Sequence, residues 1–135
     1  MSTATESTTS TDLVRSLFEA FGRRDIPFIL DRVAADCRWI CPGEMPYSGS
    51  YTGPAGAAEF FQKLSAGEEI TRFEPGEYFT NGDDVVVLGY EEARALSTGK
   101  TAASHWAMIF RVRGGKVTHW QQHFDTGAYA RAYGV

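Results

Sequence analysis

The chain contains little of what marks a disulfide-rich or nucleic-acid-binding protein. It has only two cysteines, Cys37 and Cys41, and their spacing in an expected strand separates them by about 13 Å. A disulfide needs Cα atoms within about 7 Å, so we expect two free thiols, as is typical of cytoplasmic proteins. The thirteen Lys and Arg residues are scattered and the formal net charge is −4, whereas a nucleic-acid partner would require a basic stripe.

Long apolar segments and a targeting signal are also missing. The longest apolar runs are far too short to cross a membrane, and the N-terminus lacks the charged region followed by an apolar one that forms a secretory signal. The chain is nevertheless 43% hydrophobic and 13% aromatic over 135 residues, which is enough for one globular domain with a core. We therefore expect a cytoplasmic protein whose partners include neither a membrane nor a nucleic acid.

The hydrophobic pattern changes along the chain from helical to strand-like. Residues 1–11 consist mainly of Ser, Thr, Ala and Glu and are expected to form a disordered tail, followed by a single domain at 12–135. Helices followed by a strand meander predict the α+β class, with one curved antiparallel sheet folded over the helices. The expected helices are one capped by Thr11 or Asp12, a short one after Asp25, one from Pro54 and a last one capped by Asp125 or Thr126; the expected strands are 37–42, 71–80, 85–96, 101–112 and 117–124.

The last expected hairpin, around RGGK at 113–116, indicates which side chains point inward. A two-residue turn at Gly114 and Gly115 would mix apolar residues with histidines on one face. A three-residue loop, with Gly115 in the left-handed region, pairs Val112 with Lys116 and separates the two kinds of residue. We adopt this second register, because a slip of one residue moves every side chain to the other face. Its inner face carries Ser104, Trp106, Met108, Phe110, Val112, Thr118, Trp120, Gln122 and Phe124, and its outer face His105, Arg111, Arg113, His119, Gln121 and His123.

The segment HWQQHFDT at 119–126 looks like an active site, but this register turns its histidines outward. His105 would lie opposite His123, in a solvated face or a pH-sensitive dimer interface. Metal binding is not expected, because no third ligand accompanies the pair. Gln122 is the polar residue expected inside, where its amide either forms a structural hydrogen bond or orients a ligand in an aromatic cavity.

Four segments, FGRRD, ADCRWICPGEMPYSG, RALSTGK and GGKVTHWQQHFDTGAY, occur in this order along the chain. Together they resemble the nuclear transport factor 2-like superfamily, in particular its SnoaL-like, ketosteroid isomerase-like and limonene epoxide hydrolase-like branch, over about residues 12–134. The resemblance implies a cone in which the curved sheet wraps around about three N-terminal helices and encloses an apolar pocket for a small ligand. It also implies a homodimer formed through the outer sheet face, here His105, His119, Gln121 and His123.

The resemblance carries over the catalytic residues of this branch only in part. In the ketosteroid isomerase-like frame, Cys41 takes the place of the general-base aspartate, and neither the tyrosine donor, near Leu17, nor the acid donor, at Ala107 or Met108, is recovered. That frame therefore does not predict steroid isomerisation. The pocket aspartate of SnoaL-like cyclases has its nearest counterpart in Asp125, which is also explained as a helix cap.

The epoxide hydrolase-like frame retains one acidic residue. Its two aspartates fall at Glu91 and Gln122, its arginine at Gly89, and its water-positioning tyrosine and asparagine at Trp39 and Cys41. Because an amide can act as neither base nor acid, this frame does not predict epoxide hydrolysis by the same dyad.

Glu91 is the catalytic residue that we expect, as a base whose pKa is raised by burial, provided that it faces the interior rather than solvent. Cys41 could act as a nucleophile only with a lowered pKa, and is otherwise a small buried thiol. Tyr47 and Tyr51 could donate a hydrogen bond to a ligand or cover the edge of the core with their rings. The expected ligand-binding residues are Trp39, Cys41, Tyr47, Trp106, Met108, Trp120, Gln122 and Phe124.

These residues predict general acid/base chemistry without metal or cofactor, of the isomerase, cyclase or hydrolase type, on a small apolar oxygenated substrate. The alternative is a non-catalytic ligand-binding or dimeric accessory module of the same fold.

Overall fold

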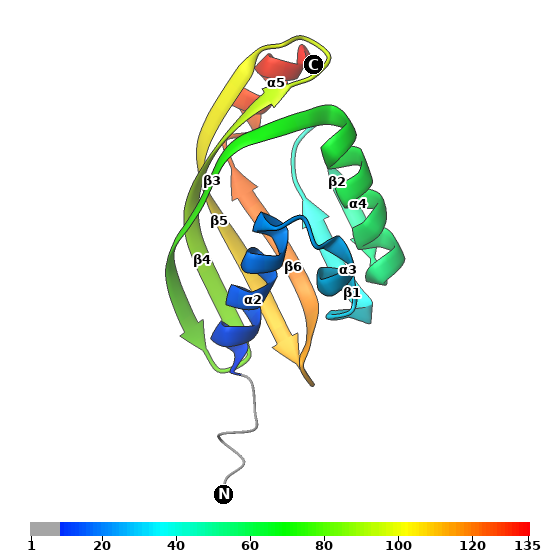
Figure 1. Cartoon of the computed structure of the whole chain (residues 1–135), viewed down its shortest axis with the longest axis vertical. Helices are drawn as coiled ribbons and strands as arrows, with labels where there is room; N and C mark the ends of the chain where they lie inside the picture. The colour runs from blue at the N-terminus through cyan, green and yellow to red at the C-terminus, as the bar shows by residue number, and fades with distance from the viewer. Residues whose placement is uncertain (1–8) are drawn as a thin grey trace, which may run out of the picture.

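The computed structural model describes residues 9–135 (Figure 1). Residues 1–8, most of the expected tail, lie outside the described residues. No helix in the described part is long and apolar enough to cross a membrane. The elements are α2 (Ser10–Gly22), α3 (Ile26–Leu30), β1 (Val33–Cys41), β2 (Gly49–Thr52), α4 (Gly53–Gly67), β3 (Glu68–Asn81), β4 (Asp84–Ala95), β5 (Thr101–Arg113), β6 (Lys116–Phe124) and α5 (Thr126–Tyr133).

The strands form one six-stranded sheet in the order β2-β1-β6-β5-β4-β3. The meander from β3 to β6 is antiparallel, as the alternating pattern predicted. One pair differs from the expected antiparallel sheet, because β1 runs parallel to β6 and places Trp39 beside Trp120. The predicted α+β class, with a curved sheet around helices, is confirmed.

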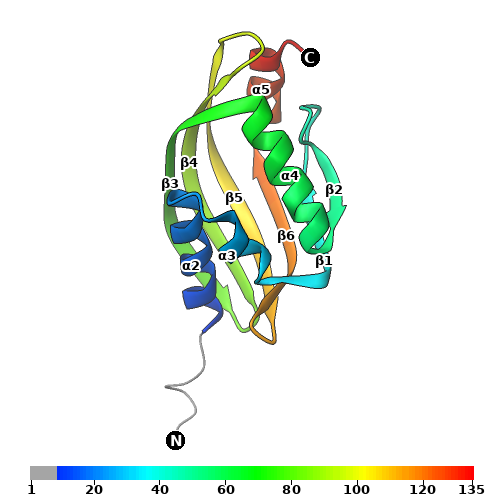
Figure 2. The ribbon, with the colours of Figure 1, turned by 45° about the vertical axis from the view of Figure 1, so that its right-hand side comes forward.

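The helices α2, α3 and α4 lie on the concave side of the curved sheet, as Figures 1 and 2 show. Helix α2 turns one apolar face inward, including Leu13 and Leu17, as the spacing of an amphipathic helix requires. Aromatic rings join the two layers: Phe18 of α2 stacks on Trp106 with ring centroids 5.8 Å apart, and Phe60 of α4 packs on Trp120 at 5.4 Å.

Two of the predicted helix caps are confirmed and one is wrong. The Asp25 carboxylate accepts a hydrogen bond from the backbone N–H of Phe28, and Asp125 accepts one from Ala128. The first helix, however, begins at Ser10 and is capped by Thr9 instead of Thr11 or Asp12. The Thr9 hydroxyl accepts from the Asp12 N–H at 3.0 Å, which satisfies a donor that has no partner within the helix.

The turn between β5 and β6 differs from the predicted three-residue loop. Arg113 pairs with Lys116, so the turn has two residues, Gly114 and Gly115, with φ of 57° and 75°. Both residues of a type I′ turn need positive φ, and glycine adopts it without strain. The two-residue turn, which was the alternative to the predicted loop, is therefore the one that forms.

A β-bulge nevertheless preserves the predicted separation of faces in this hairpin. The register shifts after Val112, which pairs with Val117, so that Arg111 pairs with His119. Thr118 is the additional residue on β6, and Val117 is buried in its place. Beyond the bulge, the inner and outer faces are those predicted from the sequence, and Gln122 points inward.

Candidate functional site

A cavity of about 70 Å³ lies between the concave face of the sheet and the helices. This volume is enough for several water molecules or a very small organic molecule. Most of its wall is apolar, with Leu17, Phe18 and Phe21 on α2 facing the sheet. Among the lining side chains of residues 9–135 there is no Lys, Arg or His. The polar lining residues are Tyr47, Glu68, Glu91 and Gln122.

The structure brings most of the expected ligand-binding residues to this cavity. Of the eight expected residues, two do not line the cavity. Cys41 is buried in the core, and Trp106 lies behind the wall, where it stacks on Phe18 and Phe73. The role of all these residues in binding stays a prediction. Those that line the cavity are Trp39, Tyr47, Met108, Trp120, Gln122 and Phe124, together with Glu91.

Glu91 points from β4 into the cavity and is 5% exposed. The side-chain amide of Gln122 on β6 donates a hydrogen bond of 3.1 Å to its Oε1 atom. Burial raises the pKa of Glu91 from its usual 4.5 to about 7, and the negative charge of Glu68 adds to this increase, while Tyr129 and Gln122 oppose it. A carboxyl group with such a pKa exchanges protons readily at neutral pH.

Glu68, at the start of β3, is a second buried carboxyl group on the same wall. It is 5% exposed and accepts a hydrogen bond of 2.7 Å from the hydroxyl of Tyr133 on α5. Burial raises the pKa of Glu68, whereas the Tyr133 and Tyr47 hydroxyls lower it by stabilising the carboxylate. The cavity thus contains two acidic groups in different hydrogen-bonding environments.

Helix α5 supplies tyrosines to both carboxyl groups. Tyr133 bonds to Glu68, and Tyr129, which is 1% exposed, acts on the pKa of Glu91. The Tyr129 hydroxyl is buried without a hydrogen bond of normal geometry among the described residues. An unpaired buried hydroxyl is unfavourable, and Glu91, whose pKa this hydroxyl lowers, is the carboxyl group beside it.

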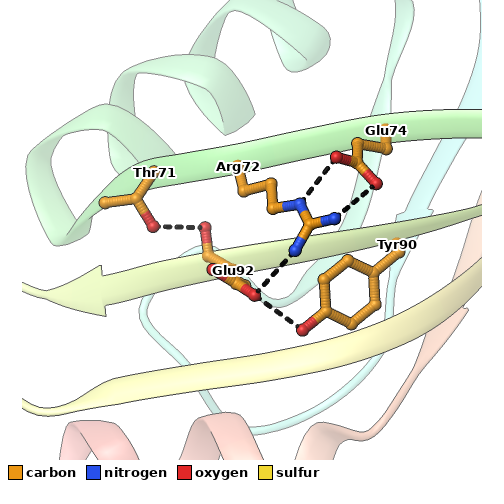
Figure 3. Close-up of polar contacts among 5 residues, drawn as sticks. All are labelled: Thr71, Arg72, Glu74, Tyr90 and Glu92. Atoms are coloured by element: carbon orange, nitrogen blue, oxygen red, sulfur yellow. Dashed lines mark hydrogen bonds and ion pairs between the residues drawn. The ribbon is translucent and has the colours of Figure 1, made fainter.

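The neighbouring residue Glu92 shows how strongly the two faces of β4 differ. Its carboxylate lies on the outer face, within 3.4 Å of Arg72, and accepts a hydrogen bond of 2.8 Å from Tyr90 (Figure 3). Arg72 also forms an ion pair of 2.6 Å with Glu74. Glu92 therefore has a cation within ion-pair distance on the exposed face, whereas the hydrogen-bond donors at Glu91 are neutral.

The cysteines have the properties of structural thiols. Both Cys37 and Cys41 are free and buried. Burial raises the pKa of Cys41 to about 12, with further increases from the charges of Glu91 and Glu68, so the thiolate is suppressed. Of the two interpretations from the sequence, the small buried thiol therefore fits the structure. Within residues 9–135, no three His, Cys, Asp or Glu side chains are grouped as metal ligands would be.

Gly89 has no space for any side chain. It pairs with Trp106 across β4 and β5, and a Cβ atom at this position would lie 2.2 Å from the indole ring. The arginine that the epoxide hydrolase-like frame places here is therefore absent for a structural reason: the Trp106 ring occupies the space above the strand.

The histidines lie on the outer face, but not in the predicted arrangement. His123 pairs with Ala107, so the expected His105–His123 pair is wrong; the bulge in β6 shifts the register. Gln121 instead links His119 at 3.2 Å and His123 at 2.9 Å along one strand. A homodimer through this face stays a prediction, which sedimentation of the purified protein would test.

Glu68 is the site residue that the sequence did not reveal. It occupies the junction where α4 ends and β3 begins, three residues before the first residue of the expected strand at 71–80. The sequence signal that could have found it is the pair Glu68-Glu69, because successive residues of a strand face opposite sides. One of the two then has to point inward, while Glu69 forms an exposed ion pair with Arg94.

Comparisons with known proteins agree with this architecture. The sequence pattern of the SnoaL-like domain matches residues 14–120. An NTF2-like protein from Burkholderia xenovorans LB400 is 38% identical, with 92% of this chain and 95% of that chain covered and a TM-score of 0.85. TerC, crystallised with polyporic acid, is 28% identical, with 95% and 100% covered and a TM-score of 0.81. An uncharacterised protein of Mycobacterium tuberculosis H37Rv is 25% identical, with 90% and 93% covered.

Proposed function

We propose that this chain, which belongs to the SnoaL-like family, is a cofactor-free enzyme. Its substrate would be a small, neutral, largely apolar molecule that carries an oxygen atom, and the enzyme would transfer protons on that molecule. The observation that carries this proposal is Glu91, a buried carboxyl group with a pKa of about 7 on the wall of an apolar cavity. Such a group is suited to general acid/base catalysis near neutral pH.

The proposed reaction begins with proton removal from carbon. The ionised Glu91 carboxylate takes a proton from the carbon next to a carbonyl group. The electron pair of the broken C–H bond forms a carbon–carbon double bond, and the negative charge passes from Glu91 to the carbonyl oxygen of the resulting enolate. Gln122 holds the carboxylate through its 3.1 Å hydrogen bond, so that little ordering is needed at the moment of transfer. Isomerisation and aldol-type ring closure share this first step. The proposal therefore concerns the removal of the proton and does not choose between the two reactions.

The cavity wall supports a neutral and partly aromatic ligand. The Trp39 and Trp120 rings stack with centroids 4.5 Å apart and line the cavity. Because the charged lining groups in the described chain are acidic, an anionic ligand would be repelled. The likeness to TerC, which was crystallised with polyporic acid, supports an organic ligand for this chain, while the two acidic lining groups favour a neutral molecule over an acid.

The second candidate is a non-catalytic ligand-binding protein. The amide at Gln122 favours this alternative, because of the two positions that carry aspartates in the epoxide hydrolase-like frame only Glu91 keeps a carboxyl group. The two candidates differ in whether bound molecules exchange protons.

Proton exchange of small ketones in D₂O distinguishes the two candidates. Cyclopentanone, cyclohexanone and cyclohex-2-enone would be incubated with the protein, and the loss of their α-protons would be followed by ¹H NMR. We expect faster exchange with the wild-type protein, rising with pH through about 7 as Glu91 ionises. Glu91→Gln should lower the protein-dependent rate by about 10²–10⁴-fold, the usual contribution of a general base.

Glu92→Gln is the matched control, because it makes the same chemical change one residue away on the outer face. It should leave the exchange rate unchanged. Equal rates for the wild-type protein and Glu91→Gln would contradict the proposal, and ketone binding without any exchange would favour the non-catalytic candidate.

A further inference from the structure

We infer that Glu68 is a positioning residue for Glu91: held by Tyr133 of α5, it keeps a buried negative charge on the cavity wall that strengthens Glu91 as a base. The inference rests on the proposed function of Glu91 and adds a residue to it. It also gives the C-terminal helix a role in the site, since the tyrosine that holds Glu68 comes from α5.

The geometry brings the two carboxyl groups to one cavity from separate strands. Glu68 begins β3 and pairs with Ala95 at the end of β4, whereas Glu91 lies earlier on β4 and pairs with Phe73. Each is 5% exposed, and both line the cavity. The inward direction of Glu68 is specific, because the adjacent Glu69 points outward to Arg94 at 2.9 Å.

The hydrogen bonds favour ionisation of Glu68 before Glu91. Glu68 accepts a bond of 2.7 Å from the Tyr133 hydroxyl, and the Tyr47 hydroxyl also stabilises its carboxylate. Glu91 has one hydrogen bond of normal geometry, from the amide of Gln122 at 3.1 Å. The Tyr129 hydroxyl also lowers its pKa, but burial and the Glu68 charge outweigh both donors. Since two like charges in one buried site are unfavourable, the remaining proton stays on Glu91 to higher pH.

No basic side chain of the described cavity wall compensates this negative charge. The effect of the Glu68 charge on Glu91 is therefore only weakly screened inside the protein. The titratable groups around the pair are neutral hydroxyls and a thiol whose own pKa values are raised: Cys41 of β1, Tyr47 between β1 and β2, and Tyr129 and Tyr133 of α5.

A titration of the free protein tests this inference without any ketone. Glutamate side chains labelled with ¹³C would be followed by NMR from pH 3 to pH 9, with the Glu91 resonance assigned by its loss in Glu91→Gln. In Glu68→Gln, we expect the apparent pKa of Glu91 to fall, corresponding to an increase of about tenfold in its acid dissociation constant. Glu69→Gln, the matched control on the outer face, should leave the Glu91 titration unchanged.

Tyr133→Phe provides a second variant that keeps the ring and removes only the hydroxyl. It should raise the apparent pKa of Glu68, because the carboxylate loses its 2.7 Å donor. A Glu91 titration that is the same in Glu68→Gln and the wild-type protein would overturn the inference. If Glu68→Gln does not fold, a Glu91 titration that is unchanged in Tyr133→Phe, in which Glu68 has lost its donor, would overturn it instead.

The two proposals can fail separately. A shifted Glu91 titration without ketone exchange would retain the coupling between the carboxyl groups and reject the enzymatic function. Ketone exchange that depends on Glu91 but not on Glu68, with unshifted titrations, would retain the proposed function and reject the role of Glu68.

Discussion

Glu91→Gln should raise the free energy of unfolding by about 3 kcal/mol at pH 9 and leave it nearly unchanged at pH 4. The reason is the increase in the pKa of Glu91 from 4.5 in the unfolded chain to about 7 in the folded protein. Below pH 4.5 the carboxyl group is protonated in both states, so its contribution to stability is fully present. As the pH rises through about 7 this contribution is lost, because the unfolded state releases its proton first.

Glutamine avoids this loss because it stays neutral at every pH. Its side-chain carbonyl can accept the same hydrogen bond from Gln122, so the neutral contact is retained. Urea unfolding at pH 4, 7 and 9 measures the effect. Glu92→Gln is the control, since its exposed contacts with Arg72 and Tyr90 contribute at most about 1 kcal/mol. Loss of stability at pH 9 in Glu91→Gln would contradict a buried, raised-pKa carboxyl group.

Gly89→Ala should lower the free energy of unfolding by about 3 kcal/mol, the upper end for overpacking a core. The added methyl group would lie 2.2 Å from the Trp106 ring. This ring cannot shift easily, because it is stacked on Phe73 at 5.2 Å and on Phe18 at 5.8 Å. Both of these rings line the cavity, so a displaced Trp106 would also deform the wall.

Gly22→Ala is the matched control for this prediction. A Cβ atom at Gly22 would meet nothing within 4 Å, and alanine favours the helix, so the stability should stay constant or rise by up to about 1 kcal/mol. Urea unfolding and near-ultraviolet circular dichroism of the tryptophans measure both variants. Equal stabilities for Gly89→Ala and Gly22→Ala would show that the strand can move away from Trp106.

Alternation along the strands was the most informative sequence pattern for the site. It placed Trp120, Gln122 and Phe124 on one face of β6, and this face is the inner one. The prediction succeeded although its turn was wrong, because the two-residue turn and the bulge at Thr118 together restore the same alternation. A local pattern determines the face of a strand, whereas the exact pairing depends on both strands.

The direction of Glu91 and the role of Glu68 could not be predicted in the same way. The strand VVVLGYEEARAL has apolar residues on both faces, because Val86 and Leu88 lie on the outer side, so alternation does not distinguish Glu91 from Glu92. Glu68 acquires its environment from Tyr133, which is 65 residues away in the sequence. Contacts over such distances follow from the packing of α5 on the sheet and leave no local pattern.

The apparent pKa of Glu91 in the substrate-free protein tests the central claim most directly. It can be measured by ¹³C NMR of labelled glutamate side chains, with Glu91 assigned through Glu91→Gln. For a buried acid/base group that exchanges protons at neutral pH, we expect the midpoint of the Glu91 titration to lie near 7. A midpoint near 4.5, the usual value of a glutamate exposed to solvent, would contradict the role proposed for Glu91.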